Sequence, residues 1–399
     1  MIQIAILGFG VVGAGVADVL TQNAVSIAQR TACEISVKYI LDVRNFPDSP
    51  YADKLISDFE TIINDPEIQI VAEAIGGAGA AYDFTKRCLL AGKSVVTSNK
   101  ELVATHGTEL LAIAKEKNVN YLFEASVGGG IPIIRPLAQC LAANEISEVC
   151  GILNGTTNYI LSKMEQTGSA FAETLKEAQA KGYAEADPTA DIEGDDSCRK
   201  ICILASLAFG EHVPPAGVST VGITQITQQD IDYAKRAGYK IKLLGRARRL
   251  ADGRTAAYVA PHLIAKSELL ANVDDVFNAV IVRGNAVGDV LFYGPGAGAL
   301  PTASAVVADV IDCAKHLDSR KQISWQPGDP NRSLDPDTLQ SRWYIRAPKG
   351  TEAGFDSIEM LSDDSMDGAV FLTTFLSQAR LVATLKATTA TCAFRLLEA

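Results

Sequence analysis

A glycine-rich turn near the N-terminus constrains the fold of this chain more than any other feature. Residues 2–7 are an apolar run of strand length that leads directly into Gly8-Phe-Gly10-Val-Val-Gly13 and an amphipathic stretch to about Arg30. In a dinucleotide-binding turn, the first glycine permits the tight bend, the second lets the backbone approach the pyrophosphate, and the third lets helix and strand pack closely. The pyrophosphate then lies at a helix N-terminus, where free N–H groups favour negative charge. We therefore predict a βαβ unit that binds NAD or NADP, rather than a glycine turn of purely structural origin.

The residues after the second predicted strand leave the choice between the two cofactors open. The apolar run 35–41 ends in Asp42, and Arg44 follows two positions later. An acid at this position binds the ribose hydroxyls of NAD, whereas a nearby arginine pairs with the 2′-phosphate of NADP. The sequence contains both signals, so it predicts a dinucleotide cofactor but does not predict whether its ribose carries a 2′-phosphate.

Strand-like and helix-like segments alternate through the first third of the chain. Further strands fit residues 69–74, 94–97 and 119–123, with helical patterns between them at 80–91 and 107–117. Such alternation predicts an α/β fold with a parallel, doubly wound sheet. We expect this Rossmann-type dinucleotide-binding domain to cover residues 1–135.

Beyond Pro136 the pattern changes to that of an α+β domain. Residues 136–143 are helix-like, 146–153 are strand-like, helical patterns follow at 156–166, 170–181 and 195–209, and strands fit 254–263 and 277–283. We predict a substrate-binding and dimerisation domain at 136–300, and we expect the small-residue helix 301–316 to complete the nucleotide domain. A polar linker at 317–340 then leads to a separate C-terminal module at 341–399.

Composition limits the partners of the chain. With 399 residues, of which 48% are hydrophobic and 21% charged, the chain can form two or three domains with a sizeable core. Its net charge of −11 argues against binding to nucleic acid or to an anionic membrane surface. The eight cysteines form no CxxC pair, which indicates reduced core residues. No signal peptide and no apolar segment of membrane-spanning length is visible, so we expect a soluble, cytoplasmic protein.

Hydride transfer to or from an alcohol needs a group that exchanges the hydroxyl proton. None of the four histidines, His106, His212, His262 and His316, lies in a pattern typical of such a site. Lysine can take this role when burial lowers its pKa, so a lysine at a strand end or a helix start near the predicted cofactor site is a candidate.

Two lysines are candidates. Lys100 lies just past the end of the apolar strand 94–97, where the ligands of open α/β sheets bind. Lys200 lies at the start of an apolar helix and Asp196 precedes it by one turn, so both side chains project from one face. The alternative for this second lysine is a surface ion pair of little energetic value.

The segments around Lys200 suit an amino-acid substrate. The preceding loop carries Glu185, Asp187, Asp191 and Asp196, which would attract an ammonium group unless they form a solvated acidic loop. Residues 151–159 join a strand to a helix N-terminus with threonine hydroxyls and amides, which suits a carboxylate.

Two more glycine-rich segments are distinctive. Residues 124–132 place Glu124 before three consecutive glycines, and one carboxylate with several carbonyl oxygens suits a hard cation, although a plain turn is an equal alternative. Residues 294–299 form a second glycine turn before a helix.

Taken in chain order, these segments resemble the homoserine dehydrogenase family. The matching stretches are GFGVVG at 8–13, VVTSNKE at 95–101, EASVGGGIP at 124–132, GILNGTTNYIL at 151–161, GYAEADPTADIEGDDSCRK at 182–200 and GPGAGALPTASAVVADV at 294–310. They extend from residue 1 to about residue 316, and the NGTTN and GYAEADPTAD stretches are specific. The resemblance implies a reversible, NAD- or NADP-dependent interconversion of L-homoserine and L-aspartate 4-semialdehyde in the synthesis of threonine, isoleucine and methionine.

The resemblance also implies roles for individual residues. Lys100 and Lys200 match the catalytic lysines of the family. The implied substrate-binding residues are Glu185, Asp191, Asp196, Tyr183, Gly155 and Thr156. The implied cofactor contacts are Gly8, Phe9, Gly10, Val11, Val12, Gly13, Ser98, Lys100, Gly182 and Gly296, together with Asp42 and Arg44. Glu124, with the carbonyl groups of Val127, Gly129 and Ile131, matches the sodium site of the family, and the implied assembly is a homodimer formed through the middle domain.

The tail departs from the family pattern. Many bacterial members end in a regulatory ACT domain, and residues 341–346 resemble its first strand, but the residues from Ala347 onward lack the usual start of its first helix. We predict a shortened, degenerate ACT-like module in this tail.

The sequence disfavours two other functions. A semialdehyde dehydrogenase needs a reactive cysteine beside a histidine, and no cysteine here lies in a Gly/Ser/Thr-rich turn with such a partner. A non-catalytic nucleotide-sensing regulator would lose the charged site, yet both lysines and the acids are present.

Overall fold

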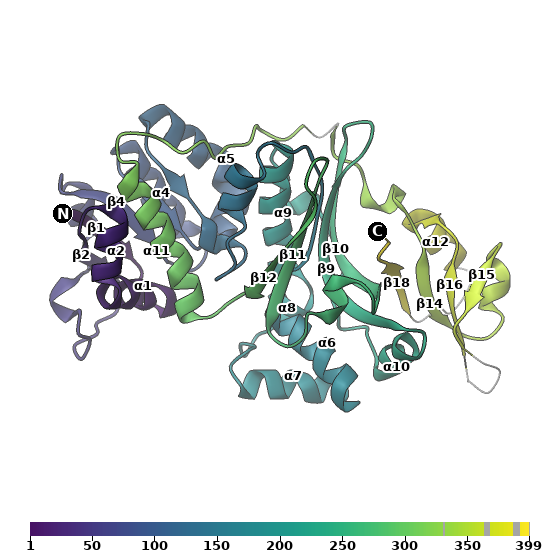
Figure 1. Cartoon of the computed structure of the whole chain (residues 1–399). Helices are drawn as coiled ribbons and strands as arrows, with labels where there is room; N and C mark the ends of the chain where they lie inside the picture. The colour runs from purple at the N-terminus through teal and green to yellow at the C-terminus, as the bar shows by residue number, and fades with distance from the viewer. Residues whose placement is uncertain (330–331, 363–367, 386–391, 399) are drawn as a thin grey trace. The chain divides into compact units, whose positions relative to one another are not determined.

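The described part of the chain divides into two compact units. The computed structural model describes residues 1–329, 332–362, 368–385 and 392–398 (Figure 1). The N-terminal unit comprises residues 1–145, 203–215 and 294–328, and the C-terminal unit comprises residues 146–202, 216–293 and 329–399.

A parallel sheet forms the centre of the N-terminal unit. Its strand order is β3-β2-β1-β4-β5-β6, and the strands are Leu55–Ile56, Ile35–Leu41, Ile2–Leu7, Ile68–Glu73, Ser94–Thr97 and Tyr121–Leu122 in that order. The central strands are almost wholly buried because helices cover both faces, as in doubly wound sheets. The order reverses between β1 and β4, and ligands of such sheets bind at the carboxyl ends of the strands at this point.

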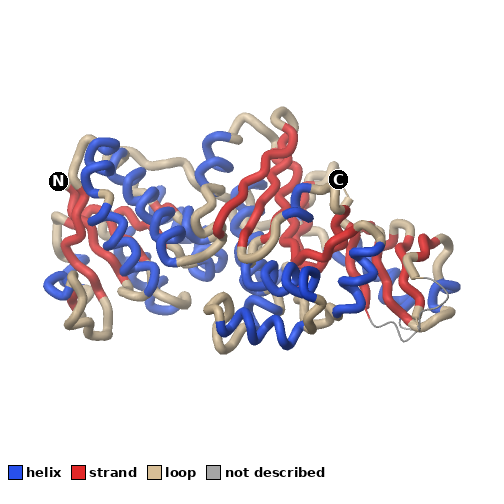
Figure 2. The backbone as a smooth tube through the Cα atoms, turned by 60° about the horizontal axis from the view of Figure 1, so that its bottom comes forward, coloured by secondary structure: helices blue, strands red, loops and turns tan. Residues whose placement is uncertain are grey.

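Helices of this unit pack in pairs against the sheet, and Figure 2 shows them in blue beside the red strands. α1 (Val11–Gln22) packs against α11 (Ala299–Lys315), and α4 (Gly79–Leu90) packs against α5 (Lys100–Lys117). α1 and α11 approach closely through small residues, since a Cβ on Gly15 would lie 3.0 Å from the Cβ of Ala303. α11 therefore belongs to the N-terminal unit although it lies late in the sequence.

Three predicted segments of this unit differ in the structure. The amphipathic stretch to Arg30 is two helices, α1 and α2 (Ala24–Thr31), with a bend of 75° between them. α5 begins at Lys100 rather than near residue 107, because Asn99 caps it. The helix-like segment 136–143 is a short π-helix at Pro136–Cys140.

No single helix in the described residues is long and apolar enough to cross a membrane. The bent pair formed by α1 and α2 reaches that length and composition only when the two are taken together.

A large mixed sheet organises the C-terminal unit. As far as the chain is described, its main path is β12-β11-β7-β9-β10-β18-β14-β16-β15, and β8 (Ser219–Thr220) pairs with β10. The first five strands of the path are Gly288–Pro295, Phe277–Gly284, Ile146–Ile152, Tyr239–Arg249 and Thr255–Ala265. β7 pairs antiparallel with β11 and β9, and β9 with β10 forms a long hairpin.

Four helices lie in the first part of the C-terminal unit, and all except the short α8 follow the predicted ranges closely. They are α6 (Gly155–Thr167), α7 (Phe171–Ala180), the short α8 (Thr189–Ile192) and α9 (Asp195–Phe209), whose last residues belong to the N-terminal unit. No predicted element corresponds to β9, β12 or α10 (Gln228–Arg236).

The tail forms a small α/β module. Its order is β14 (Trp343–Ala347), a 3-10 turn at Thr351–Gly354, β15 (Ile358–Met360), β16 (Ala369–Thr373), α12 (Gln378–Leu385) and β18 (Cys392–Leu396). The sheet order β18-β14-β16-β15 is that of a ferredoxin-like βαββαβ module in which a single turn stands in place of the first helix.

This module shares its sheet with the rest of the C-terminal unit. β18 pairs in parallel with β10, where His262 is opposite Arg395 and Leu263 is opposite Leu396. The Arg395 guanidinium lies over the rings of Tyr258 and Trp343, at 4.7 and 4.4 Å from their centroids. The predicted boundary of a separate module at residue 341 therefore falls inside one compact unit. The reason is that β18 pairs with β10 on one side and with β14 on the other, so the tail strands and the central strands form one sheet.

Candidate functional site

The glycine turn at residues 8–13 has the geometry that a dinucleotide needs. Gly8 has a φ of +91°, and a Cβ there would lie 2.8 Å from the carbonyl oxygen of Ala74. A Cβ on Gly13 would overlap the carbonyl oxygen of Gly8, so this position also excludes a side chain. α1 begins directly after Gly10, and in the described structure no side-chain hydrogen bond caps its N-terminus. Its first N–H groups thus fit the pyrophosphate of a dinucleotide.

The hydrophobic residues of this turn differ in exposure. Phe9 is buried, Val12 is half-buried, and Val11 is exposed at the start of α1. An exposed valine beside the phosphate-binding turn agrees with the predicted cofactor contact but does not test it.

Asp42 and Arg44 form an ion pair with each other. The N–H of Phe9 donates to a carboxylate oxygen of Asp42 at 2.7 Å, and Nε and Nη2 of Arg44 donate to the two carboxylate oxygens at 3.0 Å each. The Arg44 guanidinium lowers the pKa of the Asp42 carboxyl to about 2, so the carboxyl is ionised at neutral pH. The Arg44 side chain remains 60% exposed, and its Nη2 lies 4.0 Å from the position of a Cβ on Gly10. A cation is therefore held beside the phosphate-binding turn.

The carboxyl end of β5 carries Ser98, Asn99 and Lys100. Oδ1 of Asn99 accepts a hydrogen bond from the N–H of Leu102 at 3.0 Å, which caps α5. Lys100 is the first residue of this helix and is half-buried, as is Ser98. Both residues therefore lie at the edge of the sheet where the sequence predicted them.

Glu124 uses its carboxylate to hold the backbone. Oε1 accepts hydrogen bonds from the N–H groups of Ile133 and Ile134 at 2.6 and 2.8 Å, and Oε2 accepts one from Arg135 at 2.8 Å. The N–H of Glu124 donates to Asp309 on α11, and burial raises the pKa of this aspartic acid to about 8. The Glu124 carboxylate is thus committed to backbone N–H groups, so a cation in the adjoining loop would depend on carbonyl oxygens.

The loop after Glu124 packs tightly. Val127 and Ile131 are buried, and the N–H of Ile131 donates to the carbonyl of Gly128 at 2.9 Å. Gly129 has a φ of +57°, and a Cβ there would lie 2.5 Å from the carbonyl oxygen of Gly296. The two glycine-rich segments, far apart in the sequence, are therefore neighbours.

Lys200 and Asp196 are buried together on α9. Their exposed fractions are 7% and 5%, and Nζ of Lys200 lies 2.8 Å from Oδ2 of Asp196. Nζ also donates to the carbonyl oxygen of Leu153 at 2.8 Å. The alternative of a weak surface ion pair is wrong, because both charges are removed from bulk water.

Asn154 joins this ion pair to a second carboxylate. Its Nδ2 donates to Oδ1 of Asp191 at 2.7 Å and to Oδ2 of Asp196 at 2.9 Å, while its Oδ1 accepts from the N–H of Thr157 and caps α6. Burial, and then the charge of Asp196, raise the pKa of Asp191. Asn154 was not among the predicted site residues, although an asparagine directly before a helix is a typical N-cap.

The other predicted substrate residues lie around the start of α6 or on the exposed loop. Oγ1 of Thr156 donates to the carbonyl of Tyr183 at 2.7 Å, and a Cβ on Gly155 would lie 2.7 Å from the carbonyl oxygen of Val276. Gly182, Tyr183 and Glu185 are exposed. The structure thus brings together Asp191, Asp196 and Lys200 but leaves Glu185 on the surface.

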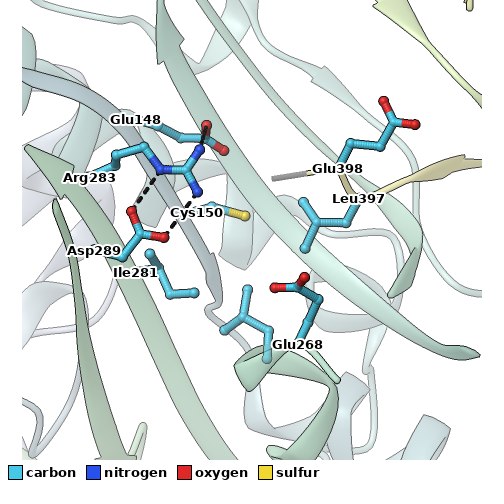
Figure 3. Close-up of a pocket in the computed structure, with 9 residues that line it drawn as sticks. Glu148, Cys150, Glu268, Ile281, Arg283, Asp289, Leu397 and Glu398 are labelled. Carbon is cyan, nitrogen blue, oxygen red and sulfur yellow. Dashed lines mark hydrogen bonds and ion pairs between the residues drawn. The ribbon is translucent and has the colours of Figure 1, made fainter. Parts of the chain in front are cut away.

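A separate pocket of the C-terminal unit shares no residue with these predicted sites. It has a volume of about 40 Å³, enough for a few water molecules, and nine residues line it (Figure 3). Arg283 donates to Asp289 at 2.7 Å and lies 3.5 Å from Glu148, so much of its charge is compensated internally.

Comparison with known proteins places both units in one family. Residues 8–124 match the model of the homoserine dehydrogenase NAD-binding domain, and residues 132–311 match the homoserine dehydrogenase model. The chain is 43% identical over 367 residues to the homoserine dehydrogenase of Neisseria gonorrhoeae, which covers 88% of this chain and 83% of that protein. This chain belongs to the homoserine dehydrogenase family.

Solved homoserine dehydrogenases have the same fold. The enzyme from Thiobacillus denitrificans matches with a TM-score of 0.90 at 38% identity and covers 100% of this chain and 98% of that chain. A hyperthermophilic archaeal homoserine dehydrogenase in complex with NADPH matches with a TM-score of 0.67 at 27% identity, covering 78% of this chain and 97% of that one.

Family membership decides between the functions considered from the sequence. The chain is an NAD(P)-dependent oxidoreductase that interconverts L-homoserine and L-aspartate 4-semialdehyde. The predicted resemblance, fold class and enzyme class are confirmed, whereas the comparisons do not support a semialdehyde dehydrogenase or a nucleotide-sensing regulator.

Proposed function

We propose that Lys100 and Lys200 are the catalytic lysines of this enzyme, and that Lys200 exchanges the proton of the homoserine hydroxyl. When bound, the nicotinamide supplies the hydride acceptor or donor. Asp191 and Asp196, with Glu185 from the exposed loop, bind the ammonium group of the substrate. The N-terminus of α6 at Gly155 and Thr156, with Tyr183 beside it, receives the substrate carboxylate.

The cluster of the buried Lys200, Asp196 and Asn154 with the half-buried Asp191 carries this proposal. A buried ion pair adds little to stability, because desolvation offsets most of the attraction between its charges. Here two carboxyl groups face one ammonium group, and the pKa of Asp191 is raised. Such a cluster gains from a second cation, and the ammonium group of an amino acid supplies one.

Replacement of Lys200 tests the catalytic assignment. We expect Lys200→Ala to lower kcat roughly 10²-fold or more, because a positioned acid–base group is lost. The formation of NADH or NADPH from homoserine, followed by absorbance, measures the turnover, and a fluorescence titration with the reduced cofactor should show unchanged cofactor binding.

Lys181→Ala is the matched control. Lys181 also pairs with a carboxylate one turn earlier, Glu177 at 2.7 Å, but its side chain is 45% exposed. We expect near-normal turnover from this variant. Near-normal turnover in Lys200→Ala as well would remove Lys200 from the mechanism.

We further propose that Arg44 makes NADP the better cofactor while NAD is also used. Its guanidinium is exposed beside Gly10, and Asp42 orients it through two hydrogen bonds. An oriented guanidinium suits a phosphate group, because its donors match two phosphate oxygens.

A sodium ion is proposed at the loop after Glu124. The groups available there are the carbonyl oxygens of Glu124, Val127, Gly129 and Ile131, and hard oxygen ligands of this kind suit an alkali cation. The Glu124 carboxylate supports the loop through its three backbone hydrogen bonds. A bound cation would hold the loop in place and is not part of the proton transfer.

The assembly and location are proposals of the same kind. We propose a cytoplasmic homodimer formed through the C-terminal unit, with a small amino-acid substrate and without nucleic acid or membrane as partners. The net charge of −11 supports the absence of nucleic-acid and membrane partners, and the lack of a CxxC pair among the cysteines supports a reducing compartment.

A further inference from the structure

Glu73 is a buried carboxyl group that the proposed chemistry does not use. It is the last residue of β4, its exposed fraction is 0%, and it lies opposite Leu7 of β1 and Thr97 of β5. It therefore lies at the carboxyl edge of the sheet, at the point where the strand order reverses. Acids are rarely buried to this extent without specific partners.

The partners of Glu73 are hydrogen-bond donors. The N–H of Ile75 donates to Oε1 at 2.6 Å, and the hydroxyl of Thr97 donates to Oε2 at 2.5 Å. Oγ1 of Thr97 in turn accepts from the N–H of Asn99 at 2.9 Å. In this arrangement the Thr97 hydroxyl gives its single proton to Glu73, so both carboxyl oxygens of Glu73 accept hydrogen bonds, as those of an ionised carboxylate do.

These bonds fix two segments of the cofactor edge. Ile75 belongs to the turn at residues 74–77, and Nδ2 of Asn99 donates to the carbonyl oxygens of Ile75 and Gly77 at 3.1 and 2.6 Å. Oδ1 of Asn99 caps α5, whose first residue is Lys100. One carboxylate thus connects the turn after β4 with the helix start that carries a proposed catalytic lysine.

The charge of Glu73 changes in the neutral range. Burial raises its pKa to about 7, and the ionisable group that faces it from β6 is Tyr121, whose pKa burial also raises. A proton on Oε2 would reverse the bond to Thr97, whose hydroxyl oxygen would then accept from both Glu73 and Asn99 and whose own proton would lose Glu73 as its acceptor. The hydrogen bonds seen here therefore match the ionised form of Glu73, and in the neutral form the Thr97 hydroxyl proton needs another acceptor.

We propose that Glu73 is a positioning residue for hydride transfer, whose ionised carboxylate holds the 74–77 turn and the start of α5 and so fixes Lys100. This inference rests on the proposed catalytic role of Lys100. Glu73 itself touches neither substrate nor the reacting atoms in this assignment.

The substitution Glu73→Gln tests the proposal. Glutamine keeps the size of the side chain, but its N–H₂ group only donates, so either the Ile75 N–H or the Thr97 hydroxyl proton loses its acceptor. We expect kcat to fall roughly tenfold or more, as for a displaced catalytic group, with the KM for homoserine within about twofold of wild type. The kcat of the wild-type enzyme should also fall as the pH decreases through about 7, and the variant should lack this limb.

Two threonines provide a second test that does not depend on Glu73→Gln folding. Thr97→Val removes the hydroxyl that links Glu73 to Asn99 and should behave like Glu73→Gln, whereas Thr97→Ser should restore kcat. Thr85→Val is the matched control, because Thr85 is equally buried and its hydroxyl has no hydrogen-bond partner among the described residues. We expect this control to keep wild-type kcat.

The variant Lys100→Met, measured in parallel, separates two failures. If it keeps wild-type turnover, both the catalytic role of Lys100 and the positioning role of Glu73 are overturned. If it loses turnover while Glu73→Gln and Thr97→Val keep the wild-type kcat and pH profile, only the positioning role is overturned.

Discussion

At the scale of single residues, several side chains serve two partners at once. Asp42 accepts the N–H of Phe9 from the glycine turn and also holds the Arg44 guanidinium. Asn154 caps α6 and also bridges Asp191 and Asp196. Such residues connect the local backbone with the site, so their replacement should change binding as well as stability.

Arg44→Ala tests cofactor selection at this scale. We expect kcat/KM with NADP to fall roughly 10- to 100-fold, because a hydrogen bond to a charged group is worth about 1.5–3 kcal/mol. The value with NAD should change little, so the NADP/NAD ratio should drop. Parallel rate measurements with both cofactors give this ratio, and Arg30→Ala, at an exposed arginine of α2, is the control. An equal loss with both cofactors would contradict the assignment.

At the scale of elements, buried charges decide what the strands and helices contact. β9 carries Lys242 and Arg246, which are 1% and 6% exposed. Lys242 donates to Asn158, Ser162 and Asp274, and Arg246 pairs with Glu148 at 2.6 Å. These partners compensate charges that would otherwise keep this strand at the surface.

A buried charge at the N-terminus of α10 also has partners on another element. Thr227 and Asp230 form a capping box, so the sequence around residues 227–230 is that of a helix start. The Asp230 carboxylate also accepts hydrogen bonds from the guanidinium of Arg346 at 2.6 and 3.0 Å and from the Tyr344 hydroxyl at 3.0 Å. One residue thus starts a helix and anchors β14 of the tail.

Asp230→Ala should destabilise the protein by about 3–5 kcal/mol, because it leaves the largely buried Arg346 without its carboxylate. Denaturant unfolding measures this loss in free energy. Asp232→Ala on the same helix is the control, since Asp232 is exposed and accepts a single bond from Gln228. The control should change stability by no more than about 0.5 kcal/mol. A similar small change in Asp230→Ala would refute the anchoring role.

At the scale of the whole molecule, the last strand determines how the tail is attached. β18 pairs with β10 on one side and with β14 on the other, so the tail module and the central strands share one sheet. His262 lies fully buried in this seam, with a hydrogen bond to the carbonyl of Ala260 at 2.9 Å. Burial, and then the neighbouring Arg246, lower its pKa to about 3.

The seam should therefore weaken in acid. An unfolded histidine titrates near pH 6.5, so His262 binds a proton more readily in the unfolded chain, and its contribution to stability is lost as the pH falls below about 6.5. Between pH 6.5 and pH 5 this amounts to about 1.5 kcal/mol. Unfolding of wild type and His262→Gln over this range measures it as a difference, with His106→Gln as the control. Parallel pH profiles for wild type and His262→Gln would contradict the prediction.

Local sequence patterns were enough to predict the dinucleotide-binding domain and the type of reaction that the enzyme catalyses. The glycine spacing at residues 8–13 and the alternation of apolar runs with helical patterns depend on local geometry, which a linear pattern records. The separation of Asp196 and Lys200 by one helical turn likewise predicted that the two side chains share a face. The same patterns, taken together, identified the family.

Tertiary structure decided which charges are buried and which partners they have. Sequence alone suggested a conflict between Asp42 and Arg44, but the structure shows an ion pair. It gave no individual role to Asn154 or Glu73, because their importance comes from partners 24 to 42 positions away. It also placed a boundary at residue 341, although β18 continues the sheet of β10. The spacing of residues within one segment can be read from the sequence. The burial of a charge and the partners that compensate it depend on which distant segments the fold brings together.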